Sequence, residues 1–118
     1  MQSRSAVFVY GSLKRGFRHA RMLDQALWLG PAAAAPFILV RYGEYPAMAP
    51  AEQGIVHGEL LLVSPDLLEA LDAFEDVPEL YQRASIRLTD GRHAYAYLVG
   101  VEVARRYPCL PSGIWREE

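Results

Sequence analysis

One carboxylate near the end of a predicted helix is placed where it could do acid–base chemistry. Ser64-Pro65 is typical of a helix start, and the apolar residues that follow recur at helical spacing. At about 100° per residue, Glu75 falls inside the apolar arc, between Leu71 and Leu68. A core-facing carboxylate is costly when it is ionised and unpaired. Two interpretations stay open: Glu75 reaches water or Arg83 where the helix unwinds, or it lies in a cavity that brings its pKa toward the working pH.

The turn that ends the first predicted strand could bind an anion. Phe8 and Val9 favour a buried strand, which stops at Gly11-Ser12. Because Gly11 has no Cβ, the backbone there can bend sharply or be approached closely. Unpaired N–H groups in such a turn would hold a carboxylate or another anion. The alternative is an ordinary strand end with a glycine in its turn.

The other candidate reactive side chains are less convincing. Acidic residues are dense between positions 69 and 79, but Glu75 projects about 100° from Asp76 and lies on a different face from Glu69. We therefore expect no metal site. His57 is interpreted as structural because no second ligand lies nearby, and nothing suggests a lowered pKa for Cys109. Phosphate-loop, dinucleotide and paired-cysteine motifs are absent, so no cofactor is expected.

The composition is that of an ordinary globular protein. The chain has 118 residues, of which 52% are apolar and 22% are charged, and we expect residues 1–118 to form a single domain. A net charge of −2 gives no general attraction to nucleic acid or to anionic membranes. The basic cluster Lys14–Arg21 is interpreted as a solvated face, with a nucleic-acid-binding adaptor as a disfavoured alternative. One cysteine, no signal-peptide profile and no membrane-length apolar run predict a cytoplasmic protein. The sequence does not indicate the oligomeric state.

The predicted elements are mostly short strands. After the first strand we expect a short helix within residues 17–26, which Gly30-Pro31 ends. A strand over Ala32–Arg41 should follow, with Pro36 at an edge or a bulge. We then expect an irregular segment over Tyr42–Met48 and a buried strand over Ile55–Val63. The helix from Ser64 precedes strands over Tyr81–Leu88 and Ala94–Val101, joined by a two-residue turn at Asp90-Gly91. The proline-rich tail should be irregular, with Trp115 as its anchor.

Taken together, the motifs resemble those of the γ-glutamylcyclotransferase-like family. The strand end Tyr10-Gly11-Ser12-Leu13, the segment Leu71-Asp72-Ala73-Phe74-Glu75 and the following Tyr81-Gln82-Arg83 carry the resemblance. Weaker matches are Tyr45-Pro46-Ala47, Val56-His57-Gly58-Glu59-Leu60 and Ser112-Gly113-Ile114-Trp115, so the pattern covers nearly the whole chain. Two departures are Asp76, where the family usually has glycine, and Ile114, where an aspartate is common.

The resemblance implies an α+β fold, with a small mixed sheet bent into a barrel-like core and short flanking helices. It also implies a small-molecule γ-glutamyl substrate, whose free α-amine attacks its own γ-carbonyl to release 5-oxoproline and an amine or amino acid. Glu75 would be the catalytic acid and base, without a metal or a cofactor. Tyr10, Gly11, Ser12, Leu13 and Tyr81 would bind the substrate, the turn N–H groups holding its carboxylate or the oxyanion. The alternative is a non-catalytic module that keeps the same cavity and binds a small ligand.

Overall fold

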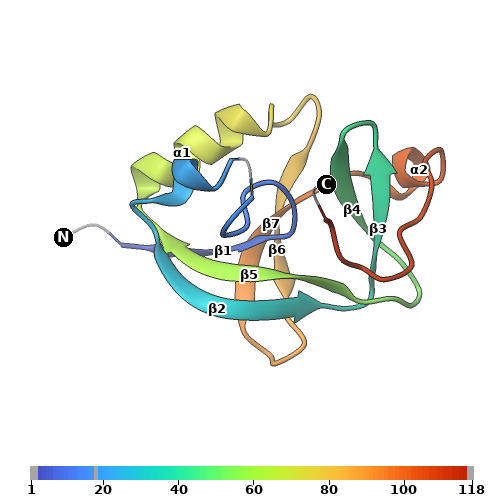
Figure 1. Ribbon diagram of the computed structural model, residues 1–118, viewed down its shortest axis with the longest axis horizontal. Coiled ribbons are helices and arrows are strands. Elements are labelled where there is room, and N and C mark those ends of the chain that lie inside the picture. The colour runs from blue at the N-terminus through green and yellow to red at the C-terminus, as the bar shows by residue number, and fades with distance from the viewer. Residues whose placement is uncertain (1–2, 18, 117–118) are drawn as a thin grey trace.

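A curled mixed sheet forms the body of the protein (Figure 1). The computed structural model describes residues 3–17 and 19–116. Within these residues the strands are β1 (Ser5–Val9), β2 (Leu27–Ala34), β3 (Phe37–Tyr42), β4 (Tyr45–Pro50), β5 (Val56–Val63), β6 (Gln82–Arg87) and β7 (His93–Leu98). Their order in the sheet is β2-β5-β1-β7-β4-β3, and β6 pairs with β7. The helices are a 3₁₀ turn η1 (Ala20–Leu23), α1 (Pro65–Phe74) and α2 (Val101–Ala104). This is the α+β, barrel-like sheet with short helices that the sequence led us to expect.

Strand β1 lies at the centre of the sheet and is buried on both faces. It runs antiparallel to β5 and parallel to β7. Val7 and Val9 belong to a core that includes Leu71 of α1, whereas Phe8 and Tyr10 belong to a second core on the opposite face. Alternate residues of a strand point to opposite faces, which explains this division. The turn after β1 therefore starts from a firmly packed strand.

The sequence-based assignment is wrong for much of the segment before residue 50. Of the described residues in this segment, only the four of η1 are helical, and Gly30-Pro31 lies inside β2, at a register shift, instead of ending a helix. The single strand expected over Ala32–Arg41 is divided between β2 and β3. The segment expected to be irregular, Tyr42–Met48, contains the turn and first half of a β3–β4 hairpin.

Pro46 and Pro50 fit in β4 although proline has no backbone N–H, because no N–H is needed at these positions to pair with β3. The N–H of Met48 points away from β3 and donates to the Tyr10 hydroxyl. In an antiparallel pair, residues two apart direct their N–H groups the same way, so positions 46 and 50 also face away from β3. Pro46 and Pro50 therefore cost the β3–β4 ladder no hydrogen bond.

The second half of the chain follows its sequence pattern more closely. Ser64 caps α1, since its Oγ accepts a hydrogen bond from the N–H of Leu67 at 3.1 Å. The β6–β7 hairpin is present, but its loop has three residues and is closed by the N–H of Leu88 donating to the carbonyl of Arg92. Residue 101, expected to end a strand, begins α2. The tail after α2 has no regular element, and Trp115 is buried as its anchor.

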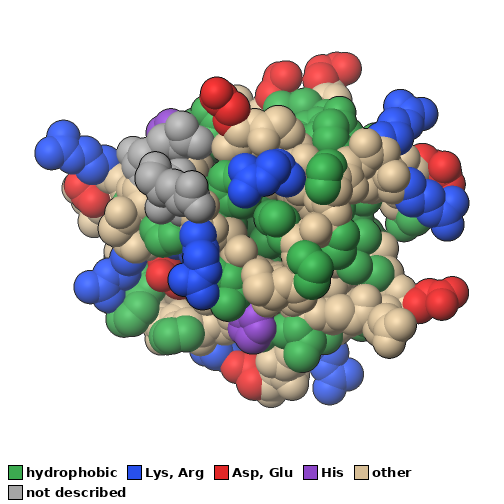
Figure 2. Space-filling model, turned by 45° about the vertical axis from the view of Figure 1, so that its right-hand side comes forward, with side chains coloured by type: hydrophobic (Ala, Val, Ile, Leu, Met, Phe, Trp, Pro, Cys, Tyr) green, Lys and Arg blue, Asp and Glu red, His purple; other side chains and the backbone are tan. Residues whose placement is uncertain are grey.

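None of the helices in the described part of the chain is long and apolar enough to cross a membrane. Acidic and basic side chains are spread over the face shown in Figure 2, with apolar side chains exposed between them. The basic cluster Lys14–Arg21 is not one solvated face. Lys14 is buried and its Nζ donates to the carbonyl of Trp115 at 2.9 Å, while the Arg15 guanidinium stacks on Trp28. Arg18 lies outside the described residues.

Candidate active site

The turn after β1 packs directly against the start of β4. A Cβ on Gly11 would lie 2.7 Å from Cγ of Pro46, so only glycine fits without a shift of one segment. The turn is closed by the N–H of Lys14 donating to the carbonyl of Gly11 at 3.1 Å. Among the described residues, no acceptor pairs with the N–H groups of Gly11, Ser12 or Leu13. This turn therefore has donors left over for an anion.

The way α1 ends determines where Glu75 points. Glu75 is the C-cap, and Asp76 after it has a positive φ of 53°. The N–H of Val77 donates to the carbonyl of Asp72, and the N–H of Asp76 donates to that of Ala73. These two bonds make a Schellman motif, in which a left-handed residue reverses the chain just after the C-cap. The side chain of Glu75 therefore still extends from the buried face of α1, whereas the backbone after it turns away from the helix.

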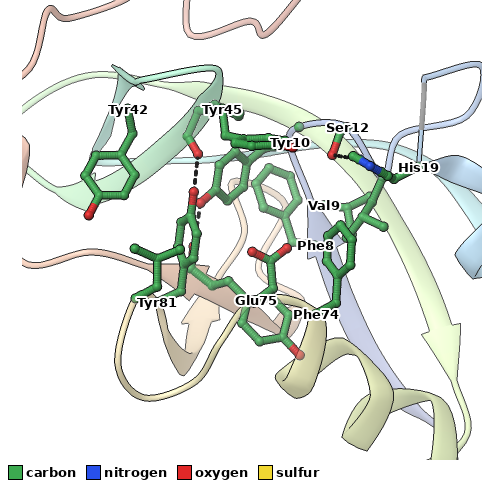
Figure 3. Close-up of a pocket in the computed structure, with 15 residues that line it drawn as sticks. Phe8, Val9, Tyr10, Ser12, His19, Tyr42, Tyr45, Phe74, Glu75 and Tyr81 are labelled. Atoms are coloured by element: carbon green, nitrogen blue, oxygen red, sulfur yellow. Dashed lines mark hydrogen bonds between the residues drawn. The ribbon is translucent and has the colours of Figure 1, made fainter.

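Both features border the same cavity, which has a volume of about 360 Å³ (Figure 3). The structure brings together there all six residues that the resemblance pointed to, namely Tyr10, Gly11, Ser12, Leu13, Glu75 and Tyr81. The other lining residues are Phe8, Val9, His19, Tyr42, Tyr45, Pro46, Phe74, Leu80 and Tyr97. Strand β1 with the turn that follows it, the end of α1 and the β3–β4 hairpin thus supply most of the wall.

Glu75 is partly buried, and its carboxyl group points into the cavity (Figure 3). Burial raises its pKa from an ordinary 4.5 to about 7. Arg83, the partner that one interpretation gave to Glu75, instead pairs with Asp72 at 3.0 Å. Among the residues that the structure describes, no Lys or Arg side chain lines the cavity. A carboxyl group in this setting can take up and release a proton near neutral pH.

The hydroxyls of the two predicted substrate-binding tyrosines are used within the protein. The Tyr10 hydroxyl donates to the carbonyl of Tyr97 and accepts from the N–H of Met48. The Tyr81 hydroxyl donates to the carbonyl of Pro46 at 2.8 Å. Burial raises the pKa of both tyrosines above the ordinary value, and the charge of Glu75 acts in the same direction. Tyr10 and Tyr81 therefore present their rings to the cavity as neutral walls.

Sequence reasoning did not find the residues at the mouth of the cavity. His19 lies there with its Nδ1 2.8 Å from Oγ of Ser12 and its ring edge-on to Phe74, at 5.2 Å between centroids. Phe74 and Tyr45 are each 40% exposed, which places them at the rim. The position of Phe74 next to Glu75 was a usable signal. Tyr45 lies in Tyr45-Pro46-Ala47, one of the weaker family matches, but the β3–β4 hairpin that places it at the rim was not predicted. His19 was noted only as part of the basic cluster Lys14–Arg21.

Within residues 3–17 and 19–116, no three His, Cys, Asp or Glu side chains are grouped so as to hold a metal ion. His57 and Cys109, set aside on sequence grounds, are both exposed and do not line the cavity. Through its described lining residues the cavity therefore offers a ligand one carboxyl group, a turn with free N–H donors, aromatic rings and the imidazole of His19.

Comparisons with known proteins match this arrangement. The family model described as "Gamma-glutamyl cyclotransferase, AIG2-like" matches residues 7–117. A protein of Vibrio cholerae serotype O1, named provisionally as a γ-glutamylcyclotransferase, is 36% identical over 110 residues, which cover 92% of this chain and 93% of that protein. The γ-glutamylaminecyclotransferase of Homo sapiens is 38% identical over 92 residues. That match covers 70% of this chain and 60% of the human protein.

The fold is similar to that of a solved structure over almost its whole length. The crystal structure of an AIG2-like protein from Mus musculus has a TM-score of 0.79 and 28% sequence identity. The superposed part covers 98% of this chain and 96% of the mouse chain. The curled sheet, and with it the relation between β1 and the end of α1, is therefore that of a known fold.

Proposed function

Because this chain belongs to the AIG2-like γ-glutamyl cyclotransferase family, we propose that it converts a γ-glutamyl amine or peptide into 5-oxoproline and a free amine or amino acid. One observation carries the proposal: the Glu75 carboxyl group and the donor-rich turn Tyr10–Leu13 face the same cavity, and no other carboxylate, Lys or Arg is found among its described lining residues. The chemistry of the reaction matches these two features.

Glu75 is proposed to transfer protons. The substrate's α-nitrogen enters as an ammonium group and ends as the lactam N–H, so it loses two protons in all. One must leave before the nitrogen lone pair can attack the γ-carbonyl carbon. When the bond between that carbon and the leaving nitrogen breaks, the leaving nitrogen needs a proton. A carboxyl group with a pKa of about 7 suits both transfers near neutral pH.

The turn Tyr10–Leu13 is proposed to hold negative charge on the substrate. The N–H groups of Gly11, Ser12 and Leu13 have no acceptor among the described residues. They can therefore donate to the substrate's α-carboxylate or to the oxyanion that forms on the γ-carbonyl. Since no Lys or Arg is found among the described lining residues, these backbone dipoles are proposed to supply positive potential to the cavity.

The aromatic walls are proposed to fold the substrate on itself. Ring closure joins two atoms of one molecule, so holding the glutamyl chain bent supplies much of the rate enhancement. Tyr10 and Tyr81 are buried and fixed by hydrogen bonds to the backbone of β4 and β7. Their rigid rings leave an extended glutamyl chain little room.

The test is the formation of 5-oxoproline from a panel of γ-glutamyl amines, γ-glutamyl amino acids and glutathione. At least one class should be turned over by the wild-type protein. Glu69→Gln, on an exposed position of the same helix, should be as active as wild type. If no compound yields 5-oxoproline while some raise the unfolding temperature, the protein is a ligand-binding module and the proposal is wrong.

A further inference from the structure

Asp72, one helical turn before Glu75, binds two donors that stand close to the active site. Its Oδ1 accepts a hydrogen bond from the Tyr97 hydroxyl at 2.8 Å, and its Oδ2 pairs with Nη1 of Arg83 at 3.0 Å. Tyr97 and Arg83 are directly opposite each other on β7 and β6. The Asp72 carboxylate thus binds a hydroxyl and a guanidinium that come from two neighbouring strands.

Both donors lie on the side of Asp72 that is near Glu75 in the fold, since Tyr97 lines the same cavity as Glu75 and Arg83 binds the residue one helical turn before it. Residues three apart on a helix have their Cβ atoms about 5–6 Å apart, so a guanidinium released from Asp72 could turn toward Glu75. Tyr97 lines the same cavity as Glu75, and the charge of Glu75 contributes to raising the pKa of Tyr97. In the structure, neither donor is bonded to Glu75.

The other titratable groups around Glu75 come from several elements. Tyr10, just after β1, and Tyr81, just before β6, line the cavity with hydroxyls already bonded to backbone groups. Tyr42 and Tyr45 border the cavity from the β3–β4 hairpin, His19 borders it before η1, and Asp76 follows Glu75 in the chain. Arg83 is bound to Asp72 opposite Tyr97 and does not itself line the cavity.

Resting on the proposed function, we propose that Asp72 is a positioning residue that acts through Arg83 and Tyr97. By binding the guanidinium and the hydroxyl, Asp72 keeps both away from the Glu75 carboxyl group, which stays free to exchange protons with the substrate. Without Asp72, the guanidinium would move to Glu75 and hold it as a paired carboxylate. A paired carboxylate has a lowered pKa and is a weaker base.

A purely structural role for Asp72 makes a different prediction. Asp72 also links α1 to the β6–β7 hairpin, so in a structural role its loss would only loosen the helix. The two side chains of the pair with Arg83 are 30% and 29% exposed, and exposed pairs of this kind contribute little to stability. Asp72→Asn keeps an oxygen for the Tyr97 hydroxyl and should therefore fold normally. The variant removes the ion pair while the link to β7 remains.

The experiment measures the protonation midpoint of Glu75 in the free protein by NMR of ¹³C-labelled glutamate side chains, assigned with Glu75→Gln. Asp72→Asn should lower the midpoint by about one pH unit or more, because the freed guanidinium stabilises the charged form. The double variant Asp72→Asn/Arg83→Gln should return it to the wild-type value. Glu69→Gln, which removes an exposed carboxylate from the same helix, should leave it unchanged.

The double variant decides between the two roles. If Asp72→Asn leaves the midpoint where it is, or if the double variant stays as low as the single one, the proposal is wrong. The acidic limb of the kcat/KM profile should move with the NMR midpoint in each variant. Because the NMR measurement needs no substrate, a protein that turns over no γ-glutamyl compound but shows these shifts would refute the proposed function and leave the control of Glu75 by Asp72 standing.

Discussion

Replacing Glu75 by glutamine should abolish activity and at the same time make the protein more stable at alkaline pH. Glutamine has nearly the same shape but cannot accept or return a proton. Removing a general base or acid typically lowers a rate by 10²–10⁴-fold, and we expect a loss of about this size in kcat/KM. Since the wild-type group has a pKa of about 7, its kcat/KM should itself fall about tenfold between pH 8 and pH 6.

The stability effect follows from the direction of the pKa shift. In the unfolded chain Glu75 ionises near its ordinary 4.5, whereas in the folded protein it ionises near 7. A raised pKa stabilises the folded state below pH 4.5, and this stabilisation is lost as the pH rises through 7. The difference corresponds to about 3 kcal/mol, which is an upper bound because the side chain keeps some contact with solvent.

Urea unfolding of both proteins at pH 4.5, 6 and 8 measures this difference, and 5-oxoproline formation measures the activity. The advantage of Glu75→Gln in unfolding free energy should grow from pH 4.5 to pH 8 by about 1–3 kcal/mol. Glu69→Gln should show no such trend. An advantage that does not change with pH would mean that Glu75 ionises normally, and an active Glu75→Gln would remove its catalytic role.

Three further substitutions test the backbone that positions these groups. Asp76→Gly should raise the unfolding free energy by about 1 kcal/mol, because position 76 has a positive φ of 53°, and Asp76→Ala should lower it; equal stability of the two variants in urea would contradict this. Gly11→Ala should lower kcat/KM by about 10–100-fold, since its Cβ would lie 2.7 Å from Cγ of Pro46 and displace the turn; normal kinetics would show that the turn tolerates the shift. Ser64→Ala should cost about 1 kcal/mol by removing the cap on the N–H of Leu67, with activity retained at temperatures where the protein stays folded.

The helix and its carboxylate could be predicted because the signals for them are local. Ser64-Pro65 gives the start of α1, and apolar spacing gives its buried face, so the placement of Glu75 on that face needs no other part of the chain. The bend at Gly11 is also visible locally. The meeting of Glu75 with this turn came from the family resemblance, since no spacing rule relates residues so far apart.

The rest of the cavity could not be predicted because it depends on long-range pairing. β4 contains Pro46 and Pro50, and it forms a strand only because its missing N–H groups face away from β3. Tyr45 reaches the cavity rim as part of that hairpin. Ser12 contacts both the side chain and the backbone N–H of His19. The sequence did not indicate this link, because His19 was interpreted as one of several residues in a basic cluster.

The position of Glu75 at the end of α1 adds a second reason for its raised pKa. The carboxyl end of a helix carries a partial negative charge, which disfavours an anion there. Burial acts in the same direction, and no Lys or Arg in the described part of the cavity lining opposes either effect. An acid at the start of a helix would instead be stabilised as a carboxylate by the free N–H groups. Two features therefore have the same consequence, namely the position of Glu75 at the C-cap and the proposed binding of the Arg83 guanidinium to Asp72. Both allow Glu75 to hold a proton near neutral pH and to give it up again.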